Sequence, residues 1–279
     1  MAKVKIPQGL TEKKEVFDFL VKNRALIVAE KKHAIKWADE IAYPSLYVNA
    51  RGEVTAKAEL AVDVPGQITR QLVINTTNLM DSHDDVHIPG LWKKTIKDNK
   101  NGFYLLQEHK MEFEKVIAEG CAASTQMMSW KSLGAAYSGE TEALVFNATI
   151  LQKRNPFMYG QYNDGFVKQH SVGMQYVIIE LAINDEDYKA EYATWNKYIN
   201  QVANKQDAED NGYFFPVLEA KISEGSAVLK GSNWITPTLG NKSLNTDEGQ
   251  PGVGPTDEEQ PFDVSAAIKQ TNFLTQKVF

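Results

Sequence analysis

The chain has a single cysteine and no long apolar run. With only Cys121 among 279 residues, it cannot form an internal disulfide or a zinc site built on several cysteines. No stretch reaches the roughly 18 to 20 consecutive apolar residues that a membrane-spanning helix needs. The first residues, MAKVK, lack the apolar run of a signal peptide. We therefore expect a protein that is not exported, has no membrane contact, and buries Cys121 as a small core residue.

The sequence also lacks an excess of positive charge, with 30 lysines and arginines against 36 acidic residues. The formal net charge of −6 argues against a nucleic-acid partner, because such binding depends on many lysine and arginine contacts to phosphates. The composition, with 43% hydrophobic and 24% charged residues, is that of an ordinary globular protein with a core. A length of 279 residues fits one domain with appendages.

The pattern along the chain divides it into three parts. Residues 1–60 predict a helical N-terminal arm, in which Thr11 can cap a helix whose apolar positions recur at helical spacing toward Trp37. Residues 61–236 contain short apolar runs separated by turn residues and predict the main domain. Residues 237–279 are acidic and rich in glycine and proline, which predicts a flexible tail because they cannot bury enough apolar surface to fold.

The main domain is expected to mix helices with strands. A helix is predicted over residues 91–98, a second is expected to have Asn155 as its cap and Pro156 at its first position, and residues 185–212 indicate a helical insertion. The predicted strands cover residues 68–74, 103–107, 114–118, 144–150, 171–183 and 220–229. These elements together predict the α+β class.

One predicted strand carries a candidate nucleophile. From Ser171 to Tyr176, large apolar residues alternate with serine, glycine and glutamine, so the strand has a core face and a small polar face. Ser171 and Gly173 share the polar face. Glycine inside a strand allows another backbone to come close, so we interpret Gly173 as space for a substrate. A serine hydroxyl is a weak nucleophile at neutral pH and needs a base within hydrogen-bond reach.

His109 is the candidate base, because it follows the apolar strand that begins at Phe103. A catalytic histidine works best when a third group holds its other ring nitrogen. Glu224, which lies in a late strand and is followed by small residues, is the preferred acid. Glu219 and the acidic residues of the Asp81 loop are its rivals.

Residues 65–236 resemble the prohead proteases of tailed bacteriophages, which are capsid maturation serine proteases related in fold to the herpesvirus assemblins. The resemblance rests on the order of four segments. They are an Asp-x-x-x-Asp-Val-x-x-Pro-Gly loop that begins at Asp81, an apolar strand leading to His109, a Ser-x-Gly-Met strand at Ser171, and a Glu-x-Ser-x-Val segment at Glu224. The chain departs from the family pattern at Lys110, where an acidic or amide residue is common.

The resemblance implies a fold and an activity. The fold would be α+β, with a mostly antiparallel β-barrel core flanked by helices. Ser171 would be the nucleophile, His109 the general base, and Glu224 the group that positions the histidine, with no cofactor and no metal. Backbone N–H groups would stabilise the oxyanion, with Lys168 and Lys230 as the basic side chains near enough in sequence to consider.

The resemblance also implies partners and a location. The substrates would be the major capsid protein and the scaffolding protein of an immature procapsid, and the enzyme would cleave itself as well. It would act as a homo-oligomer inside the procapsid, in the host cytoplasm, without a nucleic-acid or membrane partner.

Two other functions stay open. The first is a metal-dependent hydrolase, because oxygen and imidazole ligands are crowded in one loop at Asp81, His83, Asp84, Asp85 and His87. The second is a non-catalytic scaffold or assembly factor that keeps the protease fold and uses its arm and tail as contact segments. Activity that a chelator abolishes would favour the first, and capsid-protein processing that survives the loss of Ser171 would favour the second.

Overall fold

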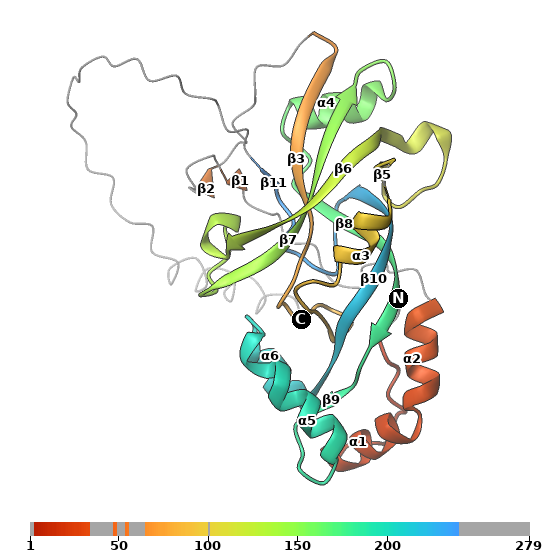
Figure 1. The fold of residues 1–279 in the computed structure, drawn as a ribbon, viewed down its shortest axis with the longest axis vertical. Coiled ribbons are helices and arrows are strands. Elements are labelled where there is room, and N and C mark those ends of the chain that lie inside the picture. Colours follow the sequence, from red (N-terminus) through yellow and green to blue (C-terminus); the bar gives the residue numbers. More distant parts are fainter. Residues whose placement is uncertain (1–2, 34–46, 49–53, 56–64, 100, 240–279) are drawn as a thin grey trace, which may run out of the picture. The chain divides into compact units, whose positions relative to one another are not determined.

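The computed structural model describes residues 3–33, 47–48, 54–55, 65–99 and 101–239. These residues form an α+β structure, as predicted, with six α-helices and one mixed sheet (Figure 1). The helices are α1 (Lys13–Lys22), α2 (Arg24–His33), α3 (Lys93–Asp98), α4 (Pro156–Asn163), α5 (Lys189–Tyr198) and α6 (Lys205–Asn211). The strands are β1 (Tyr47–Val48), β2 (Val54–Thr55), β3 (Gln67–Thr76), β4 (Asp85–His87), β5 (Phe103–Gln107), β6 (Val116–Ser129), β7 (Glu140–Leu151), β8 (Gln169–Ile179), β9 (Ala182–Ile183), β10 (Tyr213–Val228) and β11 (Thr238–Leu239).

The sheet is open. Its order is β2-β1-β11-β3-β7-β6-β5-β10-β4, with β8 and β9 both paired to β10. A barrel would require the two ends of this order to pair, and among the described strands β2 and β4 do not. The closed barrel that the resemblance implied is therefore wrong. The sheet is also mixed, because β10 runs parallel to β4 and β5 but antiparallel to β8 and β9.

The last residues of β10 lie between two other strands. Gly225 pairs with Leu105 of β5 on one side and with Val172 of β8 on the other. A side chain at Gly225 would meet Phe146 and Ile74, so this position faces the core. Because side chains alternate along a strand, the residues on either side of Gly225 project from the opposite face of the sheet.

The N-terminal arm contains two helices, whereas the sequence predicted one. The first begins after Glu12, not after Thr11, and the Glu12 N–H donates to the Glu15 carboxylate at 3.5 Å. It ends at Asn23, whose backbone and side-chain N–H groups both donate to Phe19 O, at 3.0 and 2.8 Å. This double contact terminates the helix before α2 begins. The part of the prediction that reaches Trp37 lies outside the described residues.

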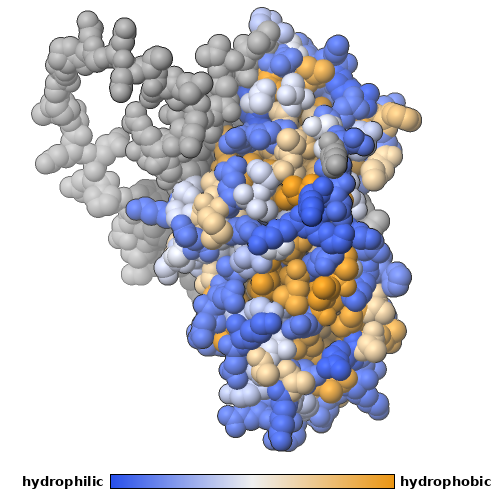
Figure 2. All heavy atoms as spheres, in the orientation of Figure 1, coloured by the Kyte–Doolittle hydropathy of each residue, from blue (hydrophilic) through white to orange (hydrophobic). Residues whose placement is uncertain are grey.

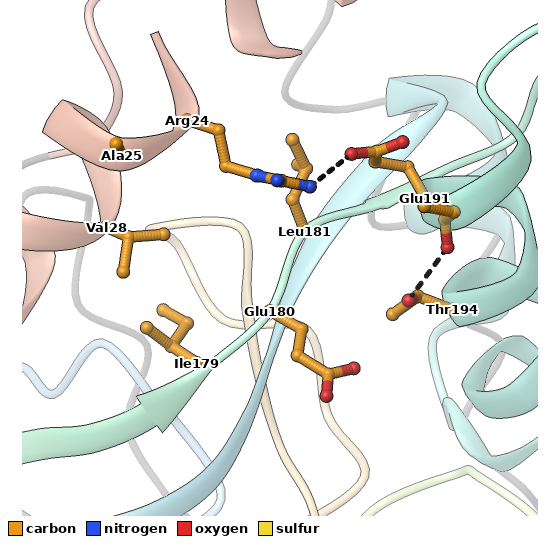
Figure 3. A pocket seen from close by; sticks show the side chains of 9 residues that line it. Arg24, Ala25, Val28, Ile179, Glu180, Leu181, Glu191 and Thr194 are labelled. Carbon is orange, nitrogen blue, oxygen red and sulfur yellow. Dashed lines mark hydrogen bonds and ion pairs between the residues drawn. The ribbon is translucent and has the colours of Figure 1, made fainter.

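Both arm helices pack against the main domain. Three apolar residues of the arm are buried in the same core cluster as the apolar residues of the strands: Phe17, Leu20 and Ile27. Arg24 reaches across to Glu191 of α5 and forms an ion pair at 2.6 Å, beside a pocket of about 360 Å³ (Figure 3). Figure 2 shows an apolar area on this face, between α3 and the arm helices, within a largely hydrophilic surface. Apolar packing and charge pairing thus both hold the arm in place.

The predictions for two helical segments are confirmed. The fourth helix begins at Pro156, and the Asn155 side chain accepts a hydrogen bond from the Met158 N–H at 3.0 Å, as an N-cap should. The insertion predicted over residues 185–212 contains α5 and α6. None of the helices in the described part of the chain is long and apolar enough to cross a membrane.

The predicted boundaries of the main domain can be compared with the structure at one end only. Thr238 and Leu239 were assigned to the tail, but they form β11 and pair with β3. The rest of the predicted tail, residues 240–279, and the boundary predicted at residue 60 lie outside the described residues.

Candidate active site

A reversal of the backbone after β5 positions His109. Glu108 and His109 both have positive φ, 53° and 58°. This left-handed region is costly for residues other than glycine, and such strain persists only where surrounding contacts impose it. Here the Glu108 N–H donates to Ala227 O at 2.9 Å, and the Lys110 N–H donates to Gln107 O at 3.1 Å. These bonds turn the chain so that His109 faces the end of β10.

His109 and Glu224 form a buried pair. Nδ1 of His109 donates to Oε1 of Glu224 at 2.6 Å, and only 6% and 5% of the two side chains are exposed. Oε2 of the same carboxylate accepts from Ser226 Oγ at 2.6 Å, and Ser226 Oγ accepts from the His109 backbone N–H at 3.1 Å. With a donor on each oxygen, the carboxylate is held in one orientation toward the imidazole.

Ser226 belongs to the site, although no role was predicted for it from the sequence. There it is only the serine of the Glu-x-Ser-x-Val segment that carries part of the resemblance. Residues two apart in a strand share a face, so its spacing from Glu224 was the signal that could have placed it beside the carboxylate. The structure makes Ser226 a positioning residue for both Glu224 and the His109 backbone.

Ser171 lies opposite Ser226 in the ladder between β8 and β10. Directly opposed residues project from the same face of a sheet, with Cα atoms about 4.5 to 5.5 Å apart. The structure therefore places Ser171 on the face that carries Glu224 and beside the serine that contacts His109. Ser226 is fully buried and donates to a carboxylate, whereas Ser171 is half-buried. Of the two serines, Ser171 is the one that a substrate can reach.

Gly173 is the residue that makes room for Glu224. It pairs with Glu224 in the ladder, and a Cβ at position 173 would lie 2.0 Å from Glu224 Oε1. The space left by the missing side chain is thus filled by the carboxylate. Our interpretation from the sequence, that this space receives a substrate backbone, is replaced by a packing requirement of the acid.

If the His109–Glu224 pair is catalytic, replacing Gly173 by alanine should lower the reaction rate on the order of 10²-fold, because a misplacement of about 1 Å in a catalytic group has that effect. The added methyl group must displace the Glu224 carboxylate and release the His109 ring. Gly160→Ala is the matched control, since a Cβ there meets no atom within 4 Å. The reaction rates of the two variants would be compared under conditions in which both are equally stable to heat. Full activity of Gly173→Ala would contradict a role for Glu224 at this position.

His170, next to Ser171 in the sequence, has a different environment. Its Nδ1 donates to Thr236 O at 3.0 Å, which leaves Nε2 to accept from the Tyr162 hydroxyl at 3.1 Å. Complete burial lowers the pKa of His170 to about 4, so the ring is neutral at physiological pH. Because it lies on the core face, we assign His170 to the packing of β8 rather than to the site.

The acidic loop that suggested a metal site does not bring its ligands together. Asp81 accepts from the backbone N–H groups of His83 and Asp85 at 2.9 and 3.2 Å. Asp84 pairs with Lys3 at 3.2 Å. Asp85 accepts from the Tyr176 hydroxyl at 2.9 Å, and Nε2 of His87 lies 3.0 Å from the same hydroxyl. Among the described residues no group of three or more histidine, cysteine or acidic side chains is arranged to hold a metal ion.

Four other residues named from the sequence have surroundings different from those of the His109–Glu224 pair. Glu219 lines a separate pocket beside α3, five positions before Glu224 on β10. Burial raises the pKa of Cys121 to about 12, so its thiol stays protonated and is a poor nucleophile. Lys168 lines a pocket next to the site, and Lys230 follows the end of β10.

Comparisons of the chain with protein-family models, with curated proteins and with solved structures gave no match.

Proposed function

We propose that the protein is a serine endopeptidase with Ser171 as its nucleophile. The observation that carries the proposal is the buried His109–Glu224 pair, held by Ser226 and lying on the sheet face that Ser171 shares. A histidine whose one nitrogen is bound to a fixed carboxylate, next to an accessible serine, is the arrangement of a base-activated nucleophile.

The tautomer of His109 supports this assignment. Because Nδ1 carries the proton that is donated to Glu224, Nε2 is the nitrogen that can accept a proton. Ser171 Oγ attacks the carbonyl carbon of the scissile peptide, and its proton moves to Nε2. The protonated ring then gives that proton to the leaving amine while the acyl group stays on Ser171. Water then attacks the carbonyl carbon of the ester and gives a proton to Nε2, and the ring passes that proton to Ser171 Oγ as the acid product leaves. Glu224 stabilises the imidazolium in both steps.

We further propose that its role is capsid maturation. The support is the resemblance of residues 65–236 to phage prohead proteases, in which the same three residues have matching positions. The substrates would be the scaffolding protein and the major capsid protein, with self-cleavage, in a homo-oligomer inside the procapsid. A herpesvirus-protease-like architecture belongs to the same proposal. The feature of this chain that best supports it is the pairing of β8, which carries Ser171, with β10, which carries Glu224.

A fluorophosphonate probe tests the catalytic part without knowledge of the substrate. Such probes react with serines that a neighbouring base activates, so we expect labelling of the wild-type chain at Ser171, located by mass spectrometry of the peptides. His109→Ala should lose the label, because the proton acceptor is gone. Heat-unfolded wild type controls for unspecific reaction. A label on Ser226, or equal labelling of His109→Ala, would overturn the proposal.

A further inference from the structure

A pocket of about 220 Å³ adjoins the site. Three of its lining residues lie within three positions of a site residue in the sequence. Glu108 precedes His109, Lys168 lies three residues before Ser171, and Ala227 follows Ser226. The remaining lining comes from α4 and the ends of the neighbouring segments and consists of Gln107, Phe157, Met158, Gln161, Phe166, Val167, Val228 and Leu229.

The pocket lies within reach of the residues that flank a scissile bond. Three extended residues span roughly 10 Å, and Lys168 lies three positions before Ser171 on the same stretch of chain. Ala227 pairs with His170 in the ladder, next to the pair formed by Ser226 and Ser171. A peptide with its carbonyl at Ser171 therefore has a neighbouring side chain that can enter this pocket.

Several apolar side chains that line the pocket are unusually exposed to solvent. Phe157, Phe166 and Leu229 are 63%, 64% and 83% exposed, although residues of these types are normally buried. Burying such surface in a complex is favourable, so exposed apolar side chains grouped around a pocket mark a binding site. The two charged lining residues, Glu108 and Lys168, have opposite signs and do not favour a charged ligand.

The volume indicates the size of the ligand. A cavity of about 150 Å³ lined by apolar residues holds a benzene molecule. A pocket of about 220 Å³ thus accepts a leucine, methionine or phenylalanine side chain.

We propose that this pocket is a specificity subsite that takes a large apolar side chain of the substrate within three residues of the scissile bond. The inference rests on the proposed peptidase function and adds to it the class of sequence that the enzyme cleaves. The peptide would lie extended along the end of β8, with its carbonyl at Ser171 and the apolar side chain between Phe166 and Leu229.

The test is the cleavage profile of the full-length chain on a peptide library, read by mass spectrometry. Wild type should show leucine, methionine or phenylalanine enriched at one fixed position within three residues of the cut. Phe166→Lys should lower kcat/KM for those peptides by about ten- to two-hundred-fold and admit acidic side chains at that position. Phe113→Lys is the matched control, since Phe113 is 89% exposed but does not line the pocket.

Fluorophosphonate labelling separates the possible failures. The small probe does not use the pocket, so wild type and Phe113→Lys should both be labelled at Ser171. Normal labelling and cleavage with no apolar preference, or with a preference that Phe166→Lys leaves unchanged, would overturn the subsite alone. If wild type is neither labelled nor active, the peptidase function fails and the subsite fails with it.

Discussion

Under the proposed maturation function, Ser171→Ala is expected to abolish processing of the capsid and scaffolding proteins when it is co-expressed with them. Removing the nucleophile of a serine protease lowers kcat by on the order of 10³ to 10⁶, because the remaining catalysis comes only from binding and oxyanion stabilisation. Ser171 is half-buried on a strand whose apolar residues face the core, so loss of one hydroxyl leaves the packing of β8 intact. Mass spectrometry of the co-expressed proteins would measure the fragments, including those of the protein itself.

Two further serines make this experiment selective. Ser138 is exposed and lies outside the site, so Ser138→Ala should process normally. Ser226→Ala keeps the nucleophile and the base but removes one hydrogen bond to Glu224, so it should slow processing without abolishing it. Normal fragments from Ser171→Ala would favour the non-catalytic assembly factor. Loss of processing only in variants of the acidic loop would favour the metal-dependent hydrolase.

The local part of this site could be predicted from the sequence. The alternation along Ser171 to Tyr176 identified β8 and its polar face, and the apolar run before His109 identified β5. Both signals reside within a few consecutive residues, where side-chain period alone decides the outcome. The same holds for α4, whose Asn155 cap and Pro156 are read directly from two adjacent positions.

Local patterns could not predict that these residues, which are distant in the sequence, come together in one site. Glu224 reaches His109 because β10 pairs with β5 and β8 at the same time, and no local pattern specifies which strands become neighbours. The positive φ of Glu108 and His109 also depends on a contact with β10, because the Glu108 N–H donates to Ala227 O. The open sheet has the same origin, because strand order is a property of long-range pairing.

The arm shows a further case of long-range packing. A charged side chain on a helix usually faces solvent, but Lys31 of α2 is 3% exposed. Its ammonium group donates to Asp85 Oδ1 at 2.6 Å and to His83 O at 3.0 Å, and lies 4.3 Å from the centre of the Phe215 ring. The other oxygen of Asp85 accepts from the Tyr176 hydroxyl at 2.9 Å. The arm thus supplies the cation for a carboxylate buried in the main domain.

Lys31→Met is therefore expected to lower the free energy of unfolding by about 3 to 5 kcal/mol, which is the usual cost of removing one partner of a buried ion pair. Methionine keeps most of the apolar stem, so the effect reports the charge rather than a cavity. Urea unfolding followed by fluorescence would measure the change in midpoint at constant slope.

The control for this prediction is an ion pair of similar length at the surface. Lys14 and Asp187 lie 2.7 Å apart, but both side chains are 66% exposed, so Lys14→Met should leave the midpoint almost unchanged. Adding Asp85→Asn to Lys31→Met removes the buried carboxylate charge and should restore part of the lost stability. If Lys31→Met unfolds at the same urea concentration as Lys14→Met, the arm does not stabilise the main domain through this pair. In that case Phe17, Leu20 and Ile27 would have to hold the arm in place by apolar packing.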